Sequence, residues 1–261
     1  TMDSTSNVRG TPPYIVATGG TPCTGAICGD YKTHVFTGPG TLCVSNAGGP
    51  SGSTTVDYLV SAGGGGGGGY GGGGGGAGGF RLSNSVGCIA APVMSPLASP
   101  TGITVSATGY PITVGSGGAG GQTPAPPGCG VKGSDSIFST ITSTGGGLGT
   151  GTVQPTGGPG GSGGGATRGP TPTSGYPGGA ASPTTSPAQG TAGGAGYDGL
   201  TLSTDGGGGG GAGAAGGNAA SYTGGDGGAG SYLGDAFFKT ACAPSYGEAG
   251  PVTNTRYISG G

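Results

Sequence analysis

The sequence predicts a mainly β protein with very little helix: a small, jelly-roll-like β-sandwich with an inserted bundle of polyglycine-II helices. Three observations predict this class. First, 76 of the 261 residues are Gly and 21 are Pro, and each Gly inside an α-helix costs about 0.8–1 kcal/mol relative to Ala. Second, short runs rich in β-branched and aromatic residues separate the glycine tracts. Third, the formal net charge is only −2, whereas disordered segments usually carry high net charge.

The glycine tracts allow two interpretations. The unbroken run 63–69 excludes collagen, which needs Gly at every third position. The tracts are then either flexible linkers or an ordered array of left-handed helices with three residues per turn and no internal hydrogen bonds. In such an array the amides bond to neighbouring helices, and only Gly lets the backbones approach closely enough. At about 3.1 Å per residue, residues 63–79 would span roughly 50 Å, which allows two or three antiparallel passes.

The chain divides into an N-terminal arm or linker, residues 1–21, and a glycine-rich domain, residues 22–261. Residues 31–37 and 41–45 flank a Gly-Pro-Gly turn and predict a hairpin. The prolines of residues 167–186 predict an exposed loop. We expect the sandwich strands at about 31–61, 103–114, 136–142, 236–239 and 256–259, and the polyglycine tracts at about 62–80 and 145–235.

Composition and charge exclude several classes of function. The seven Lys and Arg residues are scattered, so we expect no nucleic-acid partner. No run approaches the roughly 20 apolar residues of a membrane-spanning helix, and the polar start, residues 1–7, predicts no signal peptide. We expect no catalytic residue and no cofactor. Residues 160–164 fit the G-x-S-x-G pattern without its strand and helix flanks, and His34 has no acidic partner nearby in the sequence.

Cysteines and acidic residues are the candidates for covalent or metal chemistry. An even number of cysteines suggests disulfides, in which Cys23–Cys28 or Cys23–Cys43 would close short loops; the alternative is that the thiols act as small apolar fillers. With no C-x-x-C pair and one histidine, we expect no zinc site. Asp198, Asp205, Asp226 and Asp235 match no calcium repeat and are expected to be solvated. The six cysteines are Cys23, Cys28, Cys43, Cys88, Cys129 and Cys242.

Tyrosines in the glycine tracts or their turns are the candidate receptor contacts. Exposed Tyr beside Gly and Ser is typical of antibody paratopes, because the ring is rigid and amphipathic. The alternative is that these rings plug gaps between glycine helices. Tyr58, Tyr110 and Tyr257 fall in expected strands and are assigned to the core or the bundle edge. The five candidates are Tyr70, Tyr176, Tyr197, Tyr222 and Tyr232.

Seven segments carry a family resemblance in collinear order over about residues 14–261: residues 31–41, 56–60, 77–81, 107–115, 134–144, 186–190 and 256–257. Together they resemble the glycine-rich domain of marine bacteriophage virion proteins, especially those of cyanophages. Members of this family occur in tail fibres and other virion appendages. The resemblance therefore implies a virion-surface location after assembly in the host cytoplasm. It implies other virion proteins and a host receptor, a saccharide or an outer-membrane protein, as partners. It also implies a homo-oligomer with threefold symmetry, which is usual for a fibre. The six cysteines depart from the family pattern.

We therefore expect a non-enzymatic virion structural protein, in a tail fibre or fibre-like appendage, that displays host-contacting loops on a rigid glycine bundle. The alternative in the same class is a capsid-surface fibre or decoration protein. An ice-binding protein or an extracellular filament or matrix protein are alternatives from other classes. An ice-binding face needs a regular row of small residues, and the Pro-rich insert at 167–187 speaks against one. A filament protein should show one short repeat throughout, which the distinct strand segments do not.

Overall fold

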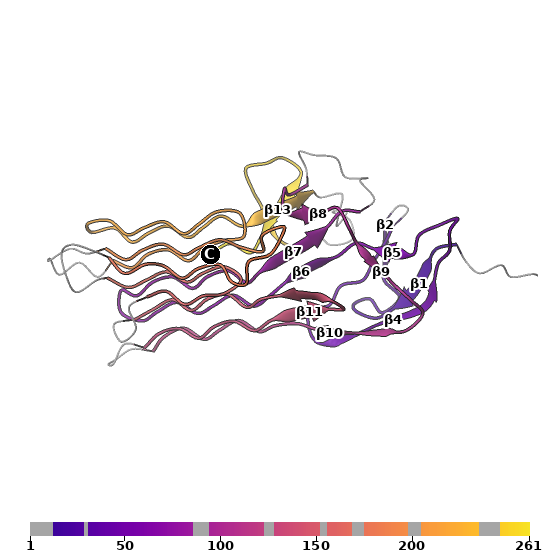
Figure 1. Cartoon of the computed structure of the whole chain (residues 1–261), viewed down its shortest axis with the longest axis horizontal. Helices are drawn as coiled ribbons and strands as arrows, with labels where there is room; N and C mark the ends of the chain where they lie inside the picture. Colours follow the sequence, from indigo (N-terminus) through magenta and orange to yellow (C-terminus); the bar gives the residue numbers. More distant parts are fainter. Residues whose placement is uncertain are drawn as a thin grey trace, which may run out of the picture.

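The fold was analysed in a computed structural model, which describes residues 13–28, 31–85, 94–122, 128–151, 156–168, 175–197, 205–234 and 246–261. In these ranges the chain is mainly β and contains no helix, which confirms the prediction of a mainly β protein with very little helix. Strands gather at one end of the molecule, and long glycine-rich segments extend from them to the other end (Figure 1).

A five-stranded antiparallel sheet contains strands from across the first half of the chain. Its order is β1-β4-β10-β11-β12. Within β4, Leu42 and Val44 are buried while Thr41 and Cys43 are exposed, which is the period-two alternation of a strand with one covered face. The strands are β1 (Ile15–Thr18), β4 (Gly40–Ala47), β10 (Gly109–Thr113), β11 (Ser136–Phe138) and β12 (Ile141–Ser143).

Smaller sheets complete the strand region. A three-stranded sheet, β6-β7-β8, has an antiparallel pair, β6 with β7, and a parallel pair, β7 with β8. A second three-stranded sheet has the order β13-β15-β14 and is antiparallel. Two antiparallel pairs, β2 with β3 and β5 with β9, lie beside them. The bounds are β2 (Ala26–Cys28), β3 (Tyr31–Thr33), β5 (Thr55–Val56), β6 (Leu59–Ser61), β7 (Phe80–Ser83), β8 (Ala98–Ser99), β9 (Ile103–Thr104), β13 (Ser231–Gly234), β14 (Glu248–Ala249) and β15 (Thr255–Ile258).

Two hydrophobic clusters hold these sheets together, one on either side of β6. The first joins the five-stranded sheet to β6 through Leu42, Val60 and Phe138. The second joins the β6-β7-β8 sheet to β13 and β15 through Phe80, Leu82 and Leu233. Because neighbouring residues of a strand point to opposite faces, Val60 packs in the first cluster and Leu59 packs against the second.

Tyr110 lies at the edge of the first hydrophobic cluster, with its ring packed on the cluster and its hydroxyl outside it. Its ring packs edge-to-face on Phe138, with centroids 6.2 Å apart. Its phenol oxygen accepts a hydrogen bond from the Ser106 backbone N–H at 2.8 Å and lies 3.2 Å from the Ser106 hydroxyl. The Ser106 side chain and, next, its amide hold the pKa of Tyr110 below its usual value, because both favour the phenolate.

The strand order differs from the sequence-based expectation in two places. Residues 15–18, expected in the arm, form β1 and pair with β4. The hairpin expected across the Gly-Pro-Gly turn is wrong: β3 pairs with β2, whereas β4 pairs with β1 and β10. The reason is packing, since Phe36 turns into the first hydrophobic cluster and ends the extended run before the turn. The strand expected at 236–239 lies outside the described residues.

Most of the glycine-rich segments lie side by side in two layers, which backbone hydrogen bonds define. Layer 1 contains, in spatial order, residues 115–121, 62–69, 72–79, 206–211 and 224–230, as shown by bonds such as Gly118 N–H to Gly64 C=O and Gly74 N–H to Gly207 C=O. Layer 2 contains residues 128–134, 144–151, 161–167, 190–197 and 214–219. Residues 157–160 and 175–181 form a shorter third row against layer 2. In Figure 1 the order runs from the magenta ribbons at the bottom to the amber ribbons at the top.

The hydrogen bonds of each segment repeat every three residues. The amides of Gly63, Gly66 and Gly69 all donate to residues 128–134 of layer 2, at 2.9–3.1 Å. The amides of Gly65 and Gly68 instead donate to residues 73–76 of the same hairpin, at 2.8 and 2.9 Å. Successive amides therefore face different neighbours, and the direction recurs after one three-residue turn.

Glycine is required inside these layers because the backbones lie too close for side chains. A Cβ atom on Gly65 would lie 2.1 Å from the Gly147 oxygen, and one on Gly66 would lie 2.0 Å from the Ala119 oxygen. Both distances are far inside van der Waals contact. At Gly64 and Gly67, on the outer side of layer 1, the nearest atom would be 3.7 Å away. Room for a side chain thus recurs only at every third residue of this segment.

Buried polar side chains connect the glycine layers to the sheets. Gln189 is 2% exposed; its Oε1 accepts from the Thr144 N–H at 2.9 Å and its Nε2 donates to the Pro183 carbonyl at 3.2 Å. Its backbone carbonyl accepts from the Phe80 N–H at 2.8 Å. Gln189 therefore satisfies backbone groups at the point where β7 and β12 join the glycine layers.

We expect Gln189→Ala to lower the free energy of unfolding by about 1–3 kcal/mol, because it leaves the buried Thr144 N–H without its acceptor. Urea unfolding followed by circular dichroism measures the loss. Gln122→Ala removes the same side chain from an exposed position and should change stability by no more than about 0.5 kcal/mol. Equal effects of the two substitutions would contradict the connecting role of Gln189.

Candidate functional site: tyrosine-bearing tips and an apolar cavity

Two of the predicted contact tyrosines lie at turns at the far end of the glycine layers. The Gly68 N–H donates to the Gly73 carbonyl at 2.9 Å and closes the turn that holds Tyr70. Residues 220 and 223 exchange backbone bonds of 2.9 and 3.0 Å around Tyr222. Both turns lie at the end opposite the sheets (Figure 1). Tyr70 is 66% exposed and Tyr222 is 73% exposed, so both rings are presented to solvent.

Both tip tyrosines have a left-handed backbone. Tyr70 has φ of 52° and Tyr222 has φ of 59°. For a residue with a Cβ this conformation costs roughly 1–2 kcal/mol, and Gly adopts it without that cost. In a chain with 76 glycines, these two positions carry a strained aromatic residue at the most exposed part of a turn.

The other three predicted tyrosines have different surroundings. Tyr176 and Tyr197 are half-buried and lie in adjacent segments, because the Gly196 N–H donates to the Tyr176 carbonyl at 3.0 Å. Tyr232 lies in β13, not in a turn; its ring packs on Tyr257 with centroids 5.5 Å apart. The structure therefore places Tyr70 and Tyr222 at exposed tips, brings Tyr176 near Tyr197, and places Tyr232 in a sheet.

The cysteines that the structure describes do not form the short bridges that the sequence allowed. Cys23 and Cys43 are free thiols and both are exposed, so neither Cys23–Cys28 nor Cys23–Cys43 is formed. Cys43 is exposed because the alternation of β4 directs Leu42 and Val44, not Cys43, into the core. Cys129 is half-buried. The side chains of Cys28, Cys88 and Cys242 lie outside the described part of the chain.

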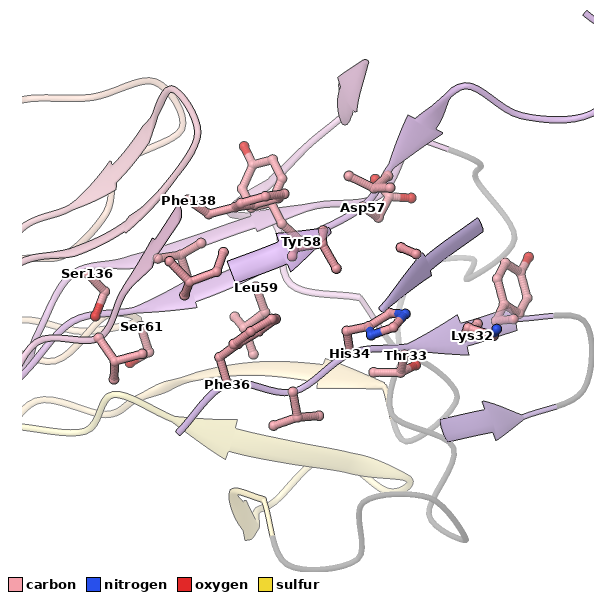
Figure 2. Close-up of a pocket in the computed structure, with 18 of the residues that line it drawn as sticks. Lys32, Thr33, His34, Phe36, Asp57, Tyr58, Leu59, Ser61, Ser136 and Phe138 are labelled. Carbon is pink, nitrogen blue, oxygen red and sulfur yellow. The ribbon is translucent and has the colours of Figure 1, made fainter. Parts of the chain in front are cut away.

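A cavity of about 890 Å³ lies within the strand region. Phe36, Leu59 and Phe138 face its middle; His34 and Lys32 lie toward one end and Ser61 and Ser136 toward the other (Figure 2). Sequence analysis missed this cavity because its lining comes from β3, β6, β10, β11 and β15, which are far apart along the chain. No local motif marks it.

Two ionisable side chains that line the cavity, His34 and Asp57, are held by structural hydrogen bonds. The His34 Nδ1 donates to the Gly19 carbonyl at 2.8 Å, which leaves Nε2 without a partner among the described residues. The Asp57 Oδ1 accepts from the Ser83 hydroxyl at 2.7 Å and the Ser85 N–H at 2.8 Å. The Ser83 hydroxyl also accepts from the Tyr58 N–H at 3.0 Å. Asp57 thus fixes the chain where β6 and β7 meet.

Within the described ranges, no cluster of three or more His, Cys, Asp or Glu side chains has the arrangement of a metal site. Asp226 is exposed and Asp205 is half-buried, while Asp198 and Asp235 lie outside those ranges. Nothing among the described residues is a helix with the length and hydropathy needed to cross a bilayer.

The chain matches the glycine-rich domain family over residues 37–261. This match covers most of the sequence, and the protein is a member of that family. No curated protein and no solved structure matches the chain.

Proposed function

We propose that this protein is a non-enzymatic structural component of a phage virion, located in a tail fibre or fibre-like appendage, which presents host-contacting turns on a stiff glycine bundle. A capsid-surface fibre or decoration protein is the nearest alternative. The other virion proteins and copies of the chain itself, with the threefold symmetry usual for a fibre, are the proposed partners at the virion surface. Membership of the glycine-rich domain family over residues 37–261 supports the glycine-rich architecture, and the resemblance of the sequence to virion proteins supports the class and the location.

The proposed architecture is a jelly-roll-like sandwich joined to a polyglycine-II bundle. The three-residue repeat of the hydrogen bonds, with partners in the neighbouring segments, supports polyglycine-II geometry. Most interior amides are fixed by a neighbouring backbone, so the bundle holds its turns without ordering long side chains. Such a support lowers the entropy that a turn loses when it binds a receptor.

The observation that carries the contact role is the strained conformation of Tyr70 and Tyr222 at the exposed tips. Stability alone favours Gly at both positions, and residues held in strained conformations often serve binding. A ring with two rotatable bonds beside small residues suits a saccharide or an outer-membrane protein, because it offers a large contact area at low entropic cost.

We expect Tyr70→Gly to raise the free energy of unfolding by about 1 kcal/mol, because the left-handed strain disappears. The same substitution should weaken host binding about tenfold or more, as is typical when an aromatic contact residue is removed. Thermal unfolding measures the first effect. Competition between the purified protein and intact phage particles for adsorption to the marine host measures the second.

Tyr14→Gly is the control, since Tyr14 is 65% exposed but precedes β1 in the strand region, away from the glycine tips. Unchanged competition by Tyr70→Gly and by a matching Tyr222→Gly variant would refute the contact role.

Location is tested separately: gold-labelled antibody against the full chain should decorate fibres of the particle. Labelling of the capsid alone would favour the decoration alternative, and no labelling of intact or disrupted particles would refute the virion assignment.

A further inference from the structure

Arg81 is a half-buried cation whose side chain has no partner in the described part of the chain. It is the second residue of β7, between Phe80 and Leu82, which both pack in the second hydrophobic cluster. Because neighbouring residues of a strand point to opposite faces, Arg81 points away from that cluster, on the same side as Val60, which lies opposite it in β6. The sheets therefore hold a positive charge that no described residue neutralises.

Arg81 lines a second cavity, of about 460 Å³, which we call the Arg81 cavity. Its lining comes from β7, the end of β8, β9 and the turn that joins β11 to β12, so it belongs to the strand region and not to the glycine tips (Figure 1). None of its described lining residues is acidic. Asp57 lines the other cavity, where its carboxylate accepts hydrogen bonds from Ser83 and Ser85. The Arg81 cavity thus carries a net positive charge among its described residues.

Side-chain hydroxyls line the Arg81 cavity together with this charge. Those of Ser99 and Thr101 lie 3.0 Å apart and form a pair. The hydroxyls of the other four Ser and Thr residues form no hydrogen bond with any described residue. Because a hydroxyl both donates and accepts, these four can bind polar groups of either kind. The six residues are Ser99, Thr101, Thr104, Ser139, Thr140 and Ser186.

Ser139 shares one feature with the tip tyrosines, a left-handed backbone in a turn. Ser139 and Thr140 form the two-residue turn between β11 and β12, and Ser139 has φ of 53°. Gly is favoured where a hairpin turn of this length needs a positive φ. In a chain with 76 glycines, this position nevertheless carries a hydroxyl, and that residue lines the Arg81 cavity.

We propose that the Arg81 cavity binds an anionic saccharide unit, a sugar ring that carries a sulfate ester or a carboxylate. The planar guanidinium offers parallel N–H donors that match the oxygens of either group. The unpaired hydroxyls can exchange hydrogen bonds with those of a sugar. Tyr58, Ile103 and Ile141 add apolar lining, on which the C–H groups of the ring can pack.

The size and place of the Arg81 cavity agree with a small ligand. Its volume of about 460 Å³ lies in the lower part of the range for small-molecule sites, about 300–1,000 Å³. The cavity lies among the sheets, at the end opposite Tyr70 and Tyr222. The inference therefore does not depend on host contact through the tips, and its failure would leave that role untouched.

The test is isothermal titration calorimetry of the full chain with four probes: glucose 6-sulfate, glucuronate, glucose and inorganic sulfate. The first two differ in their anionic group, glucose lacks that group, and inorganic sulfate lacks the ring. We expect at least one of the two charged sugars to bind. Glucose and inorganic sulfate should bind at least about tenfold more weakly, since each lacks one part of the hydrogen-bonded contact.

Three variants connect binding to the cavity. Arg81→Met keeps an unbranched side chain without the charge and should weaken binding of the charged sugar at least about tenfold. Lys132→Met removes one positive charge from an exposed residue outside the cavity and should bind like the wild type. Ser139→Gly removes one hydroxyl and relieves the left-handed conformation. We expect it to bind about threefold more weakly, while its unfolding temperature stays equal to that of the wild type or rises.

Several results would overturn the proposal: no binding of either charged sugar, equal binding by Arg81→Met and the wild type, or glucose that binds as tightly as the charged sugars. Inorganic sulfate that binds as tightly as glucose 6-sulfate would also overturn it, because the cavity would then hold an adventitious ion only. If Arg81→Met lowers the unfolding temperature, Ser139→Gly decides, and wild-type affinity in that variant would refute the site.

Discussion

Gly65→Ala is expected to lose about 3 kcal/mol or more of unfolding free energy, while Gly64→Ala, one residue away, should match or slightly exceed the wild type. The Cβ added at Gly65 would lie 2.1 Å from the Gly147 oxygen and 2.7 Å from the Gly147 carbonyl carbon. Both are backbone atoms that are fixed by their own hydrogen bonds, so relief requires residues 144–151 to move away. Overpacking of this kind costs about 1–3 kcal/mol, and the displaced segment also loses hydrogen bonds.

Gly64 supplies the matched comparison because its added Cβ would have nothing nearer than 3.7 Å. At such a position, Gly→Ala stabilises by about 0.4–1 kcal/mol by restricting the unfolded chain. Urea unfolding of both variants measures the difference directly. Similar stabilities for the two variants would mean that the glycine segments do not pack at the distances described above.

Phe80→Ala is expected to lower the free energy of unfolding by about 3–5 kcal/mol, the usual cost of removing a fully buried aromatic ring. Phe80 is 0% exposed and lies with Leu82 and Leu233 in the second hydrophobic cluster. It is also the first residue of β7, directly after the glycine segment 72–79. The cavity left by the ring would therefore loosen the sheet from which this hairpin of the bundle extends.

Denaturant unfolding with two probes tests this expectation: far-ultraviolet circular dichroism for the whole chain and hydrogen exchange for residues 62–79. Val131→Ala, at a side chain that is 55% exposed, should cost less than about 0.5 kcal/mol. If Phe80→Ala costs less than about 1 kcal/mol, the second cluster does not anchor the glycine layers.

The mainly β class could be predicted because glycine content and β-branched runs are local properties of the sequence. The pairing of β4 with β1 and β10 could not, because partners such as Cys43 and Gly109 are brought together by the burial of Leu42 and Val44. The Gly-Pro-Gly turn at the start of β4 suggested residues 31–37, which are nearer in the sequence, as the partner of β4. The incorporation of residues 15–18 into the sheet has the same cause, since only the covered face of β4 decides where β1 packs.

The candidate contact surface was partly predictable for a related reason. Tyr70 lies between two unbroken glycine runs, so a turn there follows from the sequence. Tyr232 has a similar local sequence, but it lies in a strand and not in a turn. Its position is set by the distant strand β15, in which Tyr257 lies opposite it. The cavity beside Phe36 and the open side of layer 1 at Gly64 depend on how remote segments stack, and no single stretch of sequence carries that information.

The three-residue repeat of the backbone hydrogen bonds also means that the length of the glycine segments can change without a change in the strand region. Adding three residues to each arm of a hairpin restores every amide to its original direction, so neighbouring segments and the sheets below need not change. In the proposed polyglycine-II geometry, insertions and deletions in such multiples would move a tip outward or inward in steps of about 9.3 Å. The distance between the turns and the strand region can therefore evolve independently of the strand region. The turns themselves can be replaced at any such distance. Related proteins of this design can therefore differ in the length of their glycine hairpins while they keep the same sheets.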